Sequence, residues 1–193
     1  MTPDDNPIVR AIKARRSIRK YLDKPVPEGI IQKILDAAAM SPSAINSQHW
    51  RFIVVEDRGM ILKLSGRVKK QIGLLGYGVR VAEIARSREG GIFHGAPLLI
   101  IVSAPKDDKW SEINCGIVAQ TMFLAAHSYG LGSCFIGFAN TLNDDKEALG
   151  ELAIPNGYKI IAPLVFGYPG EEKPSPKREP RVVKWVKQKQ AKK

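Results

Sequence analysis

The sequence predicts an α+β fold in three layers, with helices on both faces of a central sheet. Some segments repeat apolar residues at helical spacing, and others are short continuous apolar runs typical of buried strands. The two kinds of segment do not alternate regularly, as the units of a parallel βαβ sheet would. The length of 193 residues suits a single domain, and the chain contains no internal repeat or separate linker.

The first half of the chain contains two predicted helices and one strand. Residues 7–14 form the first helix, and residues 28–40 repeat Ile, Leu and Ala at helical spacing after an acid in the first turn. Residues 51–56 are a short β-branched run, which predicts a strand. Residues 58–95 contain eight glycines, so we expect helical pieces and mobile loops there.

The second half is more apolar. Residues 97–103 form a continuous apolar run that belongs inside a sheet, and residues 159–167 predict a last strand. Residues 113–129 are apolar on nearly every face of a helix, which predicts burial on all sides and a second subunit covering one of them. Residues 133–138 follow as a strand or extended loop, and residues 170–193, rich in Pro and Lys, form an extended arm with a basic tail.

The composition excludes several classes of protein. No apolar run reaches the length of a membrane span, and the N-terminus lacks the features of a secretory signal, so we expect a cytoplasmic protein without a membrane partner. Cys115 and Cys134 form no C-x-x-C pair and are expected to be buried, inert thiols. The three histidines lack metal-ligand spacing, so no metal site is expected at His49, His94 or His127.

The formal net charge of +11 indicates an anionic ligand. Part of the excess lies in residues 184–193, which contain five lysines and no acid. Such a run is usually a solvated chain end, and contact with nucleic acid is the less favoured alternative. A second basic cluster lies in residues 10–20.

That second cluster contains a candidate phosphate site. The chain has no Walker lysine motif, no G-x-S-x-G, and no G-x-G-x-x-G behind a strand. Guanidinium groups and a hydroxyl instead occur together in Arg15-Arg16-Ser17-Ile18-Arg19. This combination suits a phosphate monoester, which accepts paired bonds from arginine and one more from serine. A solvated helix end is the alternative interpretation.

A second candidate segment is the turn from Pro42 to Trp50. It holds the amide side chains of Asn46 and Gln48 two residues apart. Each amide offers a donor and an acceptor, which suits a ring edge that mixes carbonyl oxygens and nitrogens, as the pyrimidine side of a flavin does. Ordinary turn chemistry is the alternative for this segment taken alone.

Together these motifs resemble the nitroreductase family. The family pattern R-R-S-x-R-x-aromatic matches residues 15–21, and P-S-x-x-N-x-Q-x-W matches residues 42–50. Further matches lie at Gly95-Ala96-Pro97, at Gly130-Leu131-Gly132 after the apolar helix, at Gly167-Tyr168-Pro169-Gly170-Glu171, and at Lys177 and Arg178 before Pro180. Only residues 58–94 have no clear counterpart. The resemblance implies a three-layer nitroreductase-like fold, with a central, mostly antiparallel sheet flanked by helices and an extended C-terminal arm.

The resemblance also implies FMN held in active sites shared by a homodimer. The phosphate and ribityl end would lie on Arg15, Arg16, Ser17, Arg19 and Arg178, with Lys177 as a weaker candidate. The ring would be lined by Pro42, Ser43, Ala44, Asn46 and Gln48, some of them from the other subunit. The backbone N–H groups of Ile136 and Gly137 would face flavin N5 and O4. Relatives often carry an acid at the position of Ile136, which is aliphatic here, so no side chain is assigned a catalytic role.

The implied activity is oxidoreduction by a ping-pong mechanism. NADH or NADPH would reduce FMN, and a small oxidant such as a nitroaromatic, quinone, enone or aldehyde would then take the electrons. Two alternatives remain open: a non-reducing flavoprotein of the same fold, such as a flavin-fragmenting or iodide-releasing relative, and a basic nucleic-acid-binding protein.

Overall fold

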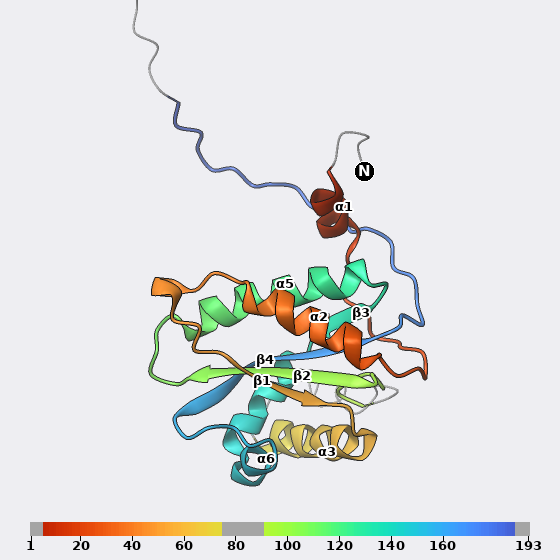
Figure 1. Cartoon of the computed structure of the whole chain (residues 1–193), viewed down its shortest axis with the longest axis vertical. Helices are drawn as coiled ribbons and strands as arrows, with labels where there is room; N and C mark the ends of the chain where they lie inside the picture. The colour runs from red at the N-terminus through yellow and green to blue at the C-terminus, as the bar shows by residue number, and fades with distance from the viewer. Residues whose placement is uncertain (1–5, 75–90, 188–193) are drawn as a thin grey trace, which may run out of the picture.

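The computed structural model describes residues 6–74 and 91–187, which form three layers (Figure 1). The middle layer is a four-stranded sheet in the order β1-β2-β4-β3, and every neighbouring pair is antiparallel. The strands are β1 (Arg51–Val55), β2 (Leu98–Pro105), β3 (Gly132–Phe135) and β4 (Tyr158–Gly167). The predicted three-layer α+β fold is confirmed.

The sheet is buried on both faces because its central strands carry apolar residues on each side. In β2, the residues Leu98, Ile100 and Val102 pack into one core, while Leu99 and Ile101 pack into the other. This division follows from the two-residue period of a strand. A continuous apolar run is therefore what the middle of this sheet requires.

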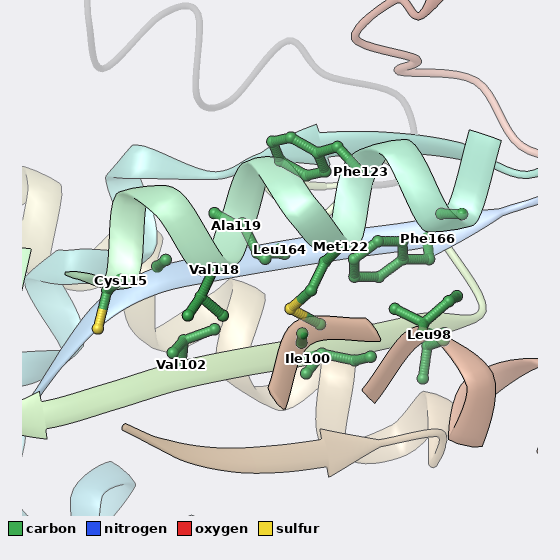
Figure 2. Packing of buried hydrophobic residues seen from close by; sticks show 14 of the residues in the cluster. Leu98, Ile100, Val102, Cys115, Val118, Ala119, Met122, Phe123, Leu164 and Phe166 are labelled. Carbon is green, nitrogen blue, oxygen red and sulfur yellow. The ribbon is translucent and has the colours of Figure 1, made fainter. Parts of the chain in front are cut away.

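One face is covered by α2 (Glu28–Ala39) and α5 (Ser111–Ser128). Figure 2 shows Val118 and Met122 of α5 directed toward the strands, in the same core as residues of β2 and β4. Both helices lie close to their predicted bounds. They form the layer from which the candidate site is built.

The opposite face is covered by α3 (Arg58–Leu74), the 3-10 helix η2 (Gly137–Asp144) and α6 (Lys146–Glu151). The α3 helix is continuous over 17 residues, where the glycine content predicts shorter pieces. The rest of that stretch, residues 75–90, lies outside the described residues. The elements η2 and α6 are absent from the sequence-based prediction.

The α5 helix is not buried on all sides in a single chain, and the expected cover of one side by a second subunit stays a prediction. Ile113 and Ile117 are 55% and 37% exposed, and Gly116 between them is exposed too. These three residues form an uncovered strip along the outer side of the helix. Among residues 6–74 and 91–187, no helix combines the length and apolarity needed to cross a membrane.

The first helix and the segment that follows β4 lie on the α5 side of the sheet (Figure 1). The first helix, α1 (Pro7–Ala14), begins after Asn6, whose side chain accepts the Val9 N–H at 2.9 Å. Residues 170–187 contain no helix or strand, and most of their side chains are exposed. Whether they act as an arm on a partner subunit stays a prediction.

Candidate functional site

The basic segment of residues 15–19 lies against the edge strand β3. Ser17 forms a bridge with Ser133, and the Ile18 N–H donates to the Ser133 carbonyl at 3.0 Å. The buried Ile18 side chain packs over Gly132, where any Cβ would come within 2.6 Å of it. A glycine at this position thus allows the basic segment to approach the sheet closely.

Positive charge accumulates beside this anchor. The Arg15 guanidinium carbon lies 5.4 Å from the centroid of the Phe123 ring in α5. Burial lowers the pKa of Arg15, and the charges of Arg178 and Arg16 lower it further. The structure therefore brings together three of the predicted phosphate residues, including one from the far end of the sequence.

Within the described part of the chain, no carboxylate forms an ion pair with Arg15, Arg16 or Arg178. The Arg16 guanidinium donates to three backbone carbonyls instead, those of Lys13, Arg15 and Pro174. By contrast, Arg67 in α3 is paired with three carboxylates, Asp145, Glu147 and Glu151. The cluster beside β3 thus has the chemistry of an anion site.

Two other predicted phosphate residues are placed differently. The Arg19 side chain is exposed, and its backbone N–H donates to the Glu171 carboxylate at 2.5 Å. Lys177 is 89% exposed and pairs with Glu179 at 3.0 Å, so nothing connects it with the cluster. Lys173 was not predicted, yet its ammonium group lies 3.1 Å from the Ser17 carbonyl oxygen. Lys173 is the better lysine candidate in this arrangement.

The amide turn adopts a strained backbone. Ile45, Asn46 and Gln48 have φ values of 50°, 55° and 47°, in the left-handed region that favours glycine. For the β-branched Ile45 this conformation is a genuine outlier, and its side chain is 99% exposed. Strain of this kind persists only where other contacts impose it, and it concentrates at functional sites.

Hydrogen bonds hold this turn in place. The Gln48 side-chain amide donates to Asn46 Oδ1 at 2.8 Å, and the Gln48 N–H donates to Ser43 Oγ at 3.1 Å. The Ala44 N–H donates to Asn114 Oδ1 of α5 at 3.2 Å. Pro42, which leads into the turn, is exposed. The two amides are therefore preorganised as one unit.

Of the two backbone N–H groups predicted to face the flavin, those of Ile136 and Gly137, one is already used within the sheet. The Ile136 N–H donates to the Pro163 carbonyl of β4 at 2.9 Å, so it is already engaged within the sheet. Gly137 is exposed and begins η2, where an N–H has no acceptor within its own helix. In residues 6–74 and 91–187 no acceptor is seen for it. The Ile136 side chain is buried and serves the core.

A hollow of about 410 Å³ is lined by residues of α5, β3, η2 and β4. Phe135, Gly116 of α5 and Asn140 of η2 line it. The Asn140 Oδ1 atom is buried without a hydrogen-bond partner among the described residues. An amide and an aromatic side chain thus border a space large enough for a ring system.

The candidate residues of one chain form two separate groups. The arginine cluster contacts α5 at Phe123, whereas the amide turn contacts α5 at Asn114. These two positions lie nine residues apart, or about 14 Å along a helix. In Figure 1 the two groups lie toward opposite ends of α5. A single chain does not bring them together.

Two features bear on other chemistries. Cys115 and Cys134 are buried, as predicted, and burial raises the pKa of the Cys115 thiol to about 12. Within residues 6–74 and 91–187, no group of three His, Cys, Asp or Glu side chains is arranged to hold a metal ion. His49 instead faces Asp108 at 3.3 Å.

Known proteins share both the sequence pattern and the fold. The model of the nitroreductase family matches residues 12–168. A protein of Methanothermobacter thermautotrophicus, whose name gives NADH dehydrogenase or NAD(P)H nitroreductase as its candidate activity, is 38% identical over 169 residues, covering 85% of this chain and 78% of the relative.

Solved structures extend the similarity to the whole architecture. A nitroreductase of Bacteroides fragilis with bound FMN superposes with a TM-score of 0.85 at 29% identity, and one from Desulfitobacterium hafniense with bound FMN superposes with a TM-score of 0.87 at 25% identity. Each comparison covers 95% of this chain and 100% of the other. The chain belongs to the nitroreductase family.

Proposed function

We propose that this protein is an FMN-dependent oxidoreductase that acts as a homodimer with shared active sites. NADH or NADPH donates a hydride and leaves before a small oxidant, such as a nitroaromatic, quinone or enone, enters the same cleft. The observation that carries the proposal is the cluster of Arg15, Arg16 and Arg178. These arginines have no carboxylate partner among the described residues, and they lie beside β3, the strand that leads to the exposed Gly137 N–H.

The arginine cluster fits a terminal phosphate. Guanidinium groups bind phosphate oxygens in pairs, and Ser17 adds a hydroxyl from the same segment. A bound dianion would also relieve the repulsion that Arg178 and Arg16 exert on Arg15. Lys173 donates to the Ser17 carbonyl, and its ammonium group also pairs with Glu171 at 2.9 Å.

The ring end is matched by the groups around Gly137. Bound FMN supplies the hydride chemistry, accepting electrons from the nicotinamide and passing them to the oxidant. The Gly137 N–H would be a donor to the ring, and preorganised donors stabilise the negative charge that increases on reduction. The Ile136 side chain is buried and aliphatic, so it holds no proton for the reaction.

The second copy supplies the amide turn. Ser43, Ala44, Asn46 and Gln48 are preorganised but lie far from the arginine cluster of their own chain. The uncovered strip on α5 offers an apolar surface for the contact between copies. In this arrangement each site takes its phosphate end from one chain and part of its ring lining from the other.

A spectroscopic experiment tests the proposal. The purified protein should be yellow, and acid should release FMN rather than FAD. Arg15→Ala should weaken FMN binding by about 1.5 to 3 kcal/mol, the range for a hydrogen bond to a charged group. Colourless protein that takes up no added FMN would contradict the proposal, as would an Arg15→Ala variant with unchanged affinity.

Kinetics separate this function from the two alternatives. Anaerobic titration with NADH and NADPH should bleach the flavin, and initial rates at several oxidant concentrations should give the parallel double-reciprocal lines of a ping-pong mechanism. A flavin that no nicotinamide reduces would favour a non-reducing flavoprotein. Oligonucleotide binding by a protein without flavin would favour the nucleic-acid-binding alternative.

A further inference from the structure

The amide turn and the residue before it run along α5 in the opposite direction to the helix. The Ser41 hydroxyl donates to Thr121 Oγ1 at 2.9 Å, and the Ala44 N–H donates to Asn114 Oδ1 at 3.2 Å. Asn114 and Thr121 are seven residues apart, so they lie on one side of the helix, two turns or about 10 Å from each other. The segment is therefore fastened to α5 at two separate points.

A third contact lies just before α5 begins. The His49 ring Nδ1 atom and the Asp108 carboxylate are 3.3 Å apart. Asp108 is itself fixed, because its carboxylate accepts the Trp110 N–H at 2.9 Å and its carbonyl accepts the Ser111 N–H at 3.0 Å. The Trp110 N–H, and to a lesser extent His49, hold the pKa of Asp108 below its usual range, so the carboxylate is charged at neutral pH. The far end of the turn thus has its own anchor.

The turn needs such anchors because its backbone is strained. Ile45, Asn46 and Gln48 all have φ values in the left-handed region, which is costly for residues other than glycine. Ser47 Oγ adds a further cost, since it is buried and has no hydrogen-bond partner among the described residues. Strained backbone persists only where the surrounding structure imposes it. The contacts with α5 and with Asp108 supply that constraint.

The imposed conformation orients one amide. The Gln48 side chain donates to Asn46 Oδ1 at 2.8 Å, so the Asn46 oxygen is used and its NH₂ group remains as a donor. In the part of the chain that the structure describes, no acceptor is seen for this NH₂ group. A fixed NH₂ group suits a carbonyl oxygen at the edge of a ring. If negative charge increases on that oxygen, a preorganised donor stabilises it.

We infer that Asn114, Thr121 and His49 are positioning residues, which hold the amide turn in the conformation that presents the Asn46 NH₂ group and so favour reduced over oxidised FMN. The inference rests on the proposed function, in which the flavin ring is the ligand of the turn. The three residues act through the turn, so none of them is assigned to the lining of the ring. Since α5 also carries Phe123 beneath Arg15, one helix positions both groups of candidate residues.

Hydrogen exchange of the apoprotein tests the positioning without flavin. The reporter is the Gln48 N–H, which donates to Ser43 Oγ within the turn and contacts none of the three positioning residues. Asn114→Leu keeps the side-chain volume but deletes the acceptor, and it should speed this exchange about fivefold, the equivalent of about one hydrogen bond. Thr121→Val should act in the same direction. Thr121→Ser retains the hydroxyl and should restore the parental rate.

Flavin titrations test the consequence for the cofactor. In Asn114→Leu and Thr121→Val, the dissociation constant of reduced FMN should rise about tenfold more than that of oxidised FMN, which lowers the two-electron midpoint potential by about 30 mV. His49→Leu should lower the potential by less, because the His49 side chain is half exposed. His49→Asn keeps a donor near the position of Nδ1 and should return the potential toward the parental value.

Asp57→Ala is the matched control. The Asp57 carboxylate accepts the Met60 N–H at 2.6 Å at the start of α3, so this variant loses the same kind of hydrogen bond at a distance from the turn. Its midpoint potential and its Gln48 exchange rate should equal those of the parent. If Asn114→Leu does not fold, the pair Thr121→Val and Thr121→Ser decides the matter.

The outcomes separate this inference from the proposed function. Flavin-loaded Asn114→Leu and Thr121→Val proteins with parental potential and parental Gln48 exchange would overturn this inference alone. An equal change in Asp57→Ala would also overturn it, because the effect would then reflect general stability. A parent protein that takes up no FMN would overturn the proposed function, and the effect on FMN inferred for the three residues would fall with it.

Discussion

Gly132→Ala tests whether the close contact between residues 15–19 and β3 positions the phosphate site. The new Cβ would lie 2.6 Å from Cγ1, 2.8 Å from Cβ and 3.0 Å from Cγ2 of Ile18, whereas ordinary contacts are 3.4–4 Å. Ile18 is buried, and its N–H bonds to Ser133, so the segment must shift as a whole. Overpacking of this kind costs about 1 to 3 kcal/mol.

The shift should appear mainly as lost cofactor affinity. If residues 15–19 move off the sheet, the dissociation constant of FMN should rise about 5- to 150-fold, because 1.4 kcal/mol is a factor of ten. Flavin fluorescence during titration of the apoprotein measures this constant, and urea unfolding of the apoprotein measures the remaining strain. Gly150→Ala is the control, since nothing lies within 4 Å of its added Cβ. A Gly132→Ala variant with parental affinity would refute the role of this contact in the site.

Three further predictions concern charge and assembly. Burial and the nearby Arg15 and Arg16 lower the pKa of His127, so a bound phosphate should raise it again and FMN binding should take up a proton. The affinity for FMN should therefore fall, relative to His127→Gln, as pH rises above the lowered pKa of the free protein. Identical pH profiles for parent and variant would show that the phosphate does not act on His127. Gly116→Arg places a charge on the uncovered strip of α5, where the added Cβ meets nothing in one chain. Light scattering should show a folded monomer that has lost FMN. An intact flavin-loaded dimer would contradict the proposed interface. The Arg67 hydrogen bond lowers the pKa of Glu147, so this ion pair stabilises the fold above the ordinary carboxyl pKa of 4.5 and stops doing so as pH falls through the lowered value. Arg67→Met should therefore be less stable than the parent at pH 7, and urea titrations should show this difference in stability shrink toward pH 3. A difference in stability that does not depend on pH would point to lost packing.

The local sequence predicted those elements in which every residue has the same environment. The apolar runs that became β2 and β4 are buried on both faces, so every position is apolar and the signal is continuous. Glycines obscured α3, yet Ile61, Leu64 and Val68 form one buried stripe at helical spacing. Tertiary packing of that stripe outweighs the weak helix propensity of glycine.

Short elements need a different signal. The six-residue α6 has too little apolar periodicity to stand out. Its start is nevertheless marked by Asp145, whose carboxylate accepts the Ala148 N–H at 3.0 Å. An N-cap search would have found it.

The candidate site was predictable only where neighbours in sequence are neighbours in space. The run from Arg15 to Arg19 shows its chemistry without a structure. Phe123 and Lys173 reach it from distant segments, and no local pattern links them to it. The engagement of the Ile136 N–H by Pro163 depends on strand register, which is likewise a tertiary property.

The proposed division of the site between two chains agrees with the geometry of α5. When two identical copies meet across a two-fold axis, residue i of one copy contacts residue j of the other, and residue j of the first contacts residue i of the second. Residues that lie on opposite sides of the axis are therefore brought together. An axis through the uncovered strip near Ile117 would run between Asn114, which holds the amide turn, and Phe123, on which Arg15 lies. The amide turn of one copy would then approach the arginine cluster of the other, and the exposed, strained Ile45 at the tip of the turn would gain a partner surface. One interface would complete both sites at once, so a substitution that opens it should empty both of FMN together rather than reduce occupancy by half.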